Sequence, residues 1–140
     1  MKLTHLSRIG LALTLSLLPV AALLAIRLIQ SVDAETIQST LAAMPVALGG
    51  GILAGAAAEA LVNRSRSTLQ TLVGLGLSAG IGVLTIGYIN LIHIRGPMSS
   101  VGTLSRTVEQ VTLFVAFLTA QGAGILLAPV VLPSRRPPAR

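Results

Sequence analysis

Four long apolar stretches, each bounded by polar or charged residues, occupy most of this 140-residue chain. They cover residues 9–26, 41–62, 69–94 and 111–132, and the ionisable side chains inside them are Glu59, Tyr88 and His93. A helix needs roughly 20 apolar residues to cross a hydrocarbon core about 30 Å thick. These stretches also lack the polar face of a helix at the surface of a soluble protein. The pattern predicts an all-α, polytopic membrane protein with four transmembrane helices in an antiparallel bundle.

The composition agrees with this pattern, since 53% of the residues are hydrophobic, 10% are charged and the mean hydropathy is +0.86. Soluble domains carry far more charge. So few residues remain outside the four stretches that we expect residues 1–140 to form a single transmembrane domain. The polar turn 98–105 is expected to be a loop, and Thr107 with Gln110 has the spacing of a capping box at the start of the fourth helix.

The ten basic residues predict the orientation of the chain. If it crosses four times, three of them fall on one side of the membrane, and the richer side holds the other seven: Lys2, Arg8, Arg64, Arg66, Arg135, Arg136 and Arg140. Cytoplasmic segments are enriched in Lys and Arg. We therefore expect both termini in the cytoplasm of a bacterial-type inner (plasma) membrane. Because these charges stand at the ends of apolar segments, they indicate lipid headgroups and not nucleic acid as partners.

The N-terminus has one alternative interpretation, a cleaved signal peptide. Residues 32–34 (Val-Asp-Ala) imitate a small-residue cleavage site. However, the apolar run before them is longer than the usual stretch of about 7–15 residues. Arg27 also separates that run from the cleavage point. The first helix is therefore expected to remain in the protein, with a kink at Pro19.

Small residues mark the second and third helices as packing surfaces. In the second, a spacing of four places small residues along one helix face that also carries Glu59: Ala43, Ala47, Gly51 and Gly55. In the third, Gly74, Ser78 and Gly82 form one stripe and Gly76 with Gly80 a second beside it. Such stripes let helix backbones approach closely in lipid. We expect a tight hairpin through residues 63–68, and a third helix that touches two neighbours, within the monomer or in another chain.

Glu59 is the first candidate functional residue, because an ionisable group inside a membrane span is costly. One interpretation is that it carries a proton or pairs with a cationic substrate. The other is an ion pair at the cytoplasmic interface with Arg64 or Arg66, since Glu59 stands only four residues before Asn63.

The remaining candidates stand in the other half of the bundle. Asn90 and His93 share a face near the end of the third helix, and Gln121 lies in the middle of the fourth. The three aromatic residues, Tyr88, Phe114 and Phe117, belong to the same half as His93. This group predicts either an outward-facing pocket or docking surface, or an ordinary polar cap over an aromatic patch. Gln121 is expected to hydrogen-bond between helices.

Several chemistries lack the residues that they need. The chain has no cysteine, which excludes thiol redox chemistry and thiolate metal sites. Its few aromatics and single His within a span argue against haem, flavin or other cofactors. No nucleophile pattern accompanies His93. The expected role is therefore a non-catalytic accessory, assembly or self-associating membrane subunit; the alternative is a small oligomeric transporter or channel that uses Glu59.

Overall fold

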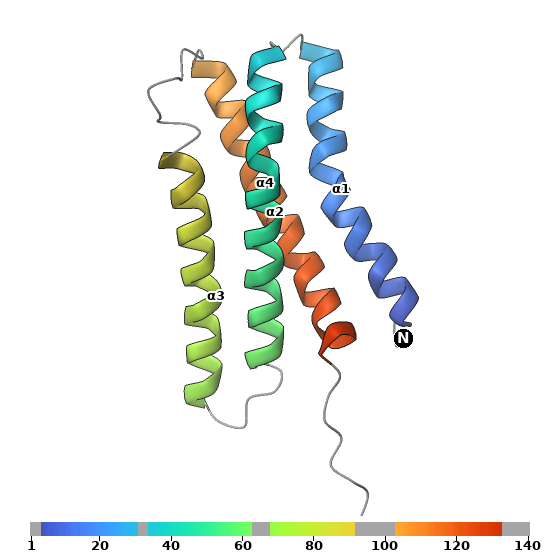
Figure 1. The fold of residues 1–140 in the computed structure, drawn as a ribbon, viewed down its shortest axis with the longest axis vertical. Coiled ribbons are helices and arrows are strands. Elements are labelled where there is room, and N and C mark those ends of the chain that lie inside the picture. The colour runs from blue at the N-terminus through green and yellow to red at the C-terminus, as the bar shows by residue number, and fades with distance from the viewer. Residues whose placement is uncertain (1–3, 31–33, 63–67, 92–102, 133–140) are drawn as a thin grey trace, which may run out of the picture.

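The structure, a computed structural model, is helical throughout the part of the chain that it describes (Figure 1). It describes residues 4–30, 34–62, 68–91 and 103–132, without the side chains at positions 27, 30, 62 and 103–105. The helices are α1 (His5–Gln30), α2 (Ala34–Val62), α3 (Thr68–Ile89) and α4 (Thr103–Val131). All four are long and apolar enough to cross a membrane. The all-α class predicted from the apolar stretches is confirmed.

The helices extend beyond the apolar stretches at their N-terminal ends. α2 begins at Ala34, before the apolar stretch that starts at residue 41, and α4 begins at Thr103, before the capping box predicted at Thr107. Thr107 therefore lies inside α4, and the predicted capping box is wrong. Hydropathy marks where lipid contact begins, whereas a helix can continue through polar turns beyond that point. The described part of α3 ends with a wider helical turn over Asn90 and Leu91.

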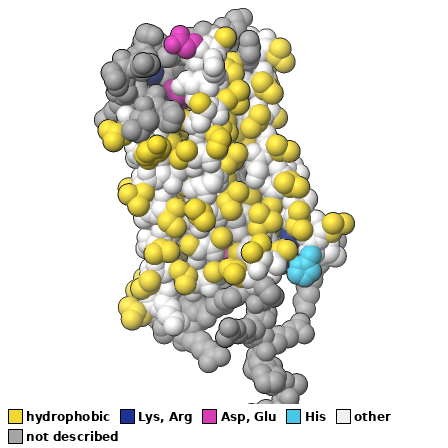
Figure 2. Space-filling view, in the orientation of Figure 1, with side chains coloured by type: hydrophobic (Ala, Val, Ile, Leu, Met, Phe, Trp, Pro, Cys, Tyr) yellow, Lys and Arg dark blue, Asp and Glu magenta, His cyan; other side chains and the backbone are white. Residues whose placement is uncertain are grey.

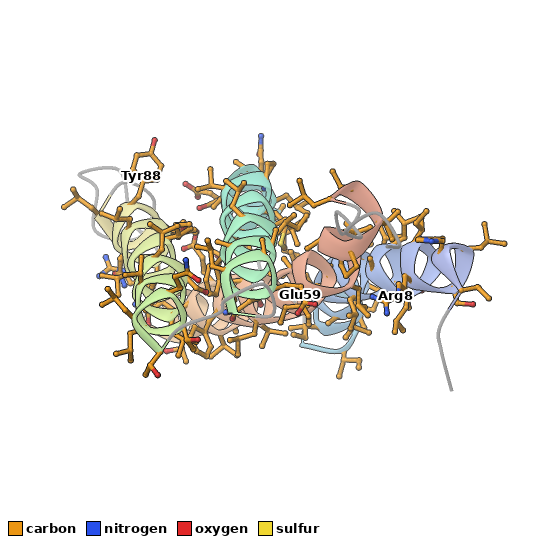
Figure 3. All side chains as sticks on the ribbon, turned by 90° about the horizontal axis from the view of Figure 1, so that it is seen from below. Arg8, Glu59 and Tyr88 are labelled. Atoms are coloured by element: carbon orange, nitrogen blue, oxygen red, sulfur yellow. The ribbon has the colours of Figure 1, made fainter. Side chains whose placement is uncertain are left out.

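α3 and α1 stand on opposite sides of α2, and α4 crosses behind α2 from the α3 side at its upper end to the α1 side at its lower end (Figures 1 and 3). In Figure 1, α1 and α3 begin at the lower end, and α2 and α4 begin at the upper end. The most extensive contact joins α2 to α4, α3 packs on α2, and α1 packs on α4. Each outer helix, α1 or α3, therefore packs mainly on one of the two central helices, α4 or α2.

Small residues bring α2 and α4 close together. A Cβ atom added to Gly51 would meet the backbone of Phe117 and lie 2.7 Å from the Cβ of Ala120. One added to Gly55 would collide with the carbonyl oxygen of Gln121. From the other side, a Cβ added to Gly124 would collide with the carbonyl oxygen of Ile52. Ala43 and Ala47 are fully buried along the same helix.

The contact between α2 and α3 follows the Gly74, Ser78 and Gly82 stripe. The Ser78 hydroxyl donates a hydrogen bond of 2.9 Å to the backbone carbonyl of Ala54. A Cβ added to Gly74 would lie 2.6 Å from that of Leu61, and one added to Gly50 would collide with the Thr85 side chain. The α3 residues on this side are buried. The connection through residues 63–67 lies outside the described residues.

α1 continues through Pro19 and bends near its middle (Figure 1). Pro19 is buried and cannot donate a backbone hydrogen bond. The nearby Ser16 hydroxyl donates to the carbonyl of Ala12, at 2.9 Å. Because Pro19 has no backbone N–H, the carbonyl of Leu15 lacks its usual helical hydrogen bond. The Ser16 hydroxyl does not replace that bond, since it donates to Ala12.

Hydrophobic side chains cover the middle of the visible surface, as Figure 2 shows, with acidic groups at the upper end and a His near the lower end. Many large apolar residues on α1 and α3 are exposed, among them Leu13, Leu17, Val83 and Leu84. Such a surface is unfavourable in water and favourable in a hydrocarbon phase. The four helices are thus compatible with an integral membrane protein.

Candidate functional site

A long groove separates α3 from α4. Its lower part has a volume of about 460 Å³ and its upper part about 350 Å³. Ile86 and Phe114 line both parts, so the two are continuous. Phe117 joins the two walls, because its ring lies 3.1 Å from the position of a Cβ on Gly82. We call this feature the α3–α4 groove.

The structure brings two of the predicted polar residues to this groove. Asn90 lines its upper part with Gln110, and Gln121 lines its lower part with Ser78. The Oδ1 atom of Asn90 is buried and has no hydrogen-bond partner within the described ranges. The groove therefore offers one unused hydrogen-bond acceptor among mainly apolar walls. His93, the residue paired with Asn90 by spacing, lies outside the described residues.

The aromatic residues do not form one group. Phe117 is buried and Phe114 lies at the edge of the α3–α4 groove, but Tyr88 is half exposed and points away from the other helices (Figure 3). Tyr88 is not among the residues that line the groove. The expectation of a single aromatic patch therefore holds for the two Phe residues and not for Tyr88.

The second glycine stripe of α3 lies on the opposite side from the first, and not beside it. Residues that are two positions apart in an α-helix are separated by about 200° around its axis. Gly76, two residues after Gly74, and Gly80, two residues after Ser78, therefore lie on the opposite side of α3. Both are exposed, as are Val83 and Gly87, and a Cβ at any of the three glycines would meet nothing within 4 Å. We call these four residues the α3 outer face. Within the described chain it is covered by no other helix.

Glu59 lies in the last turns of α2, near the lower end of the molecule. Its side chain is half-buried and lies where α1, α2 and α4 approach one another, in the same region as Arg8 of α1 (Figure 3). Glu59 lines neither part of the α3–α4 groove. The predicted partners Arg64 and Arg66 lie outside the described residues. Glu59 is therefore not part of the groove that Asn90 and Gln121 line.

A buried polar cluster between α2 and α4 is absent from the sequence-based predictions. Glu109 is only 2% exposed, and the Ser39 hydroxyl donates a hydrogen bond of 2.7 Å to its Oε1 atom. Thr36 and Thr40 are fully buried on α2, and the Thr40 hydroxyl donates to the Thr36 carbonyl at 2.7 Å. Thr112 is buried one turn after Glu109. We call these five residues the α2–α4 polar cluster.

The sequence contains one signal for this cluster. Thr36, Ser39 and Thr40 recur at helical spacing, so they share a face in any helix that begins before them. The predicted second helix begins at residue 41, so these three residues fall outside it. Glu109 falls in the first turn of the predicted fourth helix, before its apolar stretch and at the expected membrane interface. Three or more potential metal-binding His, Cys, Asp or Glu side chains do not gather anywhere in the described part of the chain.

Comparison with protein-family models, with curated proteins and with solved structures finds no match for this chain.

Proposed function

We propose that this chain is an integral membrane protein of a bacterial-type inner membrane, with an antiparallel four-helix bundle and both termini in the cytoplasm. We further propose that it is a non-catalytic accessory, assembly or self-associating subunit that binds other membrane helices through its Gly/Ala-rich faces. The observation that carries this proposal is the α3 outer face, where two glycines one turn apart are open.

Helix association in lipid depends on close van der Waals contact, because lipid chains are as apolar as the helix surfaces. Three glycines of α2 (Gly50, Gly51 and Gly55) and the inner glycines of α3 already serve contacts within the chain. Gly76 and Gly80 have no such contact among the described residues. A glycine in a helix interior costs about 1 kcal/mol relative to alanine in water, so an open pair needs a reason. Close approach by a helix of another subunit supplies one.

The alternative function, a transporter or channel that uses Glu59, has less support. A substrate path through a bundle requires the carboxylate to line a cavity. Glu59 stands one turn from the end of α2 and apart from the α3–α4 groove. Its position favours an interfacial role. We therefore expect Glu59→Gln to leave association with partners intact.

The test is purification from native membranes in mild detergent, followed by identification of the proteins that remain bound. Gly80→Leu fills the α3 outer face and should reduce recovery of the partner roughly tenfold, since interhelical contacts contribute about 1–2 kcal/mol. Gly10→Leu is the matched control, because Gly10 is equally open but lies on α1. It should retain the partner.

The outcomes discriminate between the proposals. The proposed role is supported if the wild-type chain is purified with a defined set of other subunits, or as a ring of its own copies. This association should be lost in Gly80→Leu and kept in Gly10→Leu. Recovery of an isolated monomer from native membranes, or equal partner binding by wild type and Gly80→Leu, contradicts it. Loss of pH-dependent flux in Glu59→Gln vesicles would instead support the transporter.

A further inference from the structure

The α3–α4 groove has the composition of a small-molecule site. Ligand sites in proteins are clefts of about 300–1,000 Å³ with mainly apolar walls and a few polar groups, and they occur between the helices of bundles. The two continuous parts of the groove have volumes of about 350 Å³ and 460 Å³. Ile86 and Phe114 line both parts, and Phe117 lines the lower one. The groove therefore has room for an extended apolar chain.

The upper part of the groove contains a polar atom that lacks a partner. The Oδ1 atom of Asn90 is buried and has no hydrogen-bond donor within the described chain. Gln110 lines the same part of the groove and does not donate to this atom. A buried oxygen without a donor is rare, because its lost hydration is not compensated. A small rotation of the amide about its Cβ–Cγ bond, a torsion with broad minima, brings this oxygen to a donor in the groove.

The polar groups of the groove are neutral, which limits the chemistry of an occupant. Among the described residues that line it, the polar ones are Ser78, Asn90, Gln110 and Gln121, and none is ionisable. Arg106 stands one turn before Gln110, but it lines neither part and already has an interaction of its own. A charged group that enters an apolar site without a counter-charge loses its hydration without compensation. A hydroxyl group is uncharged and both donates and accepts hydrogen bonds, so it matches two amides.

We propose that the α3–α4 groove binds one molecule of an uncharged, long-chain lipid alcohol. Its hydroxyl group donates a hydrogen bond to the Oδ1 atom of Asn90 and accepts one from the amide N–H of Gln110. Its alkyl chain runs down the groove against the rings of Phe114 and Phe117. The groove thus receives an amphiphile with its polar end at the upper level and its apolar end below.

The lower part of the groove agrees with an apolar chain over most of its length. The Ser78 hydroxyl already donates to the carbonyl of Ala54, so it needs no donor or acceptor from the ligand. Gln121 lies about 16 Å below Gln110 along α4 at the usual rise of an α-helix. The alkyl chain therefore has apolar contacts over this distance before it reaches the Gln121 amide.

This inference does not depend on the proposed association, because different residues of α3 carry the two. Ala79 lines the lower part of the groove, whereas Gly80 belongs to the α3 outer face. Ala79 is exposed, so a larger side chain there fills the groove without displacing a buried neighbour. Ala79→Leu should therefore abolish alcohol binding and keep the partner. Gly80→Leu should do the reverse.

Photolabelling of the full chain in detergent tests the site. Three probes carry a diazirine at the same carbon of one alkyl chain and differ in their end, which is an alcohol, a phosphate monoester or a methyl group. Labelling of α3 and α4 peptides is divided by that of α1 peptides, which report general contact with the micelle. The alcohol should give the highest ratio, roughly fivefold above the methyl probe, the effect of one buried hydrogen bond. The phosphate probe should fall below the alcohol.

Two substitutions locate the labelling. Asn90→Leu removes the amide and should lower the ratio of the alcohol probe to that of the methyl probe. Ala79→Leu should bring all three probes to the α1 level, and Gly80→Leu, the control, should keep the wild-type ratios. The probe series uses the wild-type chain, so its result does not depend on the folding of the variants.

Equal ratios for the three probes overturn the proposal, since they are the result for ordinary contact with bulk lipid. A higher ratio for the phosphate probe than for the alcohol also overturns it, because the head is then a charged one. So does an alcohol ratio that stays at the wild-type value in Asn90→Leu and Ala79→Leu. These ratios are read whether or not a partner is purified with the chain, so failure here is distinct from failure of the proposed association.

Discussion

Individual glycines decide how closely α2 and α4 approach. At Gly55 the neighbouring atom is a backbone carbonyl oxygen, that of Gln121. Backbone cannot move aside as the end of a flexible side chain can, so any side chain here requires the helices to separate. Gly49 lies on the same helix but is exposed, and a Cβ added there would meet nothing within 4 Å.

These two positions give a matched pair of substitutions. Gly55→Ala should destabilise the folded chain by roughly 1–3 kcal/mol, because the added methyl group overpacks the α2–α4 contact. Gly49→Ala should change the free energy of unfolding by less than about 1 kcal/mol, or raise it slightly through helix propensity. Reversible unfolding in mixed detergent measures both. Equal stability of the two variants would contradict the close α2–α4 contact.

Single residues also show what could be predicted from the sequence and what could not. The spacing of Gly51 and Gly55 was visible, because helical periodicity alone places them on one face. The burial of Glu109 was not, since it results from α2 passing over the first turns of α4. The exposure of Tyr88 depends in the same way on which helix lies beside it. Burial is a property of neighbours, and hydropathy does not identify neighbours.

α3, like α1, is held chiefly by one neighbouring helix. It packs on α2, and Phe117 supplies a contact with α4 across the α3–α4 groove. A hydrogen bond between the two helices runs from Ser78 to the carbonyl of Ala54. Elements with few buried contacts open at lower free energy than the rest of a fold. We therefore expect α3 to separate from the bundle more readily than the central helices α2 and α4.

Removal of that hydrogen bond should loosen α3 specifically. Ser78→Ala should lower stability by roughly 0.5–1.5 kcal/mol and increase amide hydrogen exchange in α3 more than in α4. Thr119→Val is the control, because the Thr119 hydroxyl bonds to the carbonyls of Val115 and Ala116 in its own helix. Hydrogen exchange read by mass spectrometry distinguishes the helices. A uniform increase over α3 and α4 would show that α3 does not open separately.

Helix number was predictable for a physical reason, whereas helix ends were not. An apolar stretch of about 20 residues that is bounded by charged residues is typical of one membrane-spanning helix, so the number of stretches predicts the number of helices. The extra N-terminal turns of α2 and α4 contain Thr, Ser, Gln and Glu, which no hydropathy window includes. Those turns hold four of the five residues of the α2–α4 polar cluster. The error in helix ends therefore concealed the cluster as well.

At the scale of the whole molecule, the two outer helices α1 and α3 expose much of their apolar surface. Because α3 packs on α2 and α1 packs on α4, each outer helix has a neighbour mainly on one side (Figure 1). Such an arrangement exposes more apolar surface than a compact bundle, and the α3 outer face is part of it. The spacing of residues in the sequence shows which residues share a helix face. It does not show which other helix packs on that face. The open surface is what connects this fold to the proposed role in association.

The proposed role depends on the proposed topology, in which four helices cross a membrane and both termini face the cytoplasm. The sequence has no cysteine, so a single introduced one reports its own position. Ser65→Cys, between the second and third apolar stretches, should react with a membrane-impermeant maleimide only after the cells are opened. Ser100→Cys, between the third and fourth, should react in intact cells. Reaction of Ser65→Cys from outside, or recovery of the chain in the soluble fraction without detergent, would contradict a four-span protein with cytoplasmic termini.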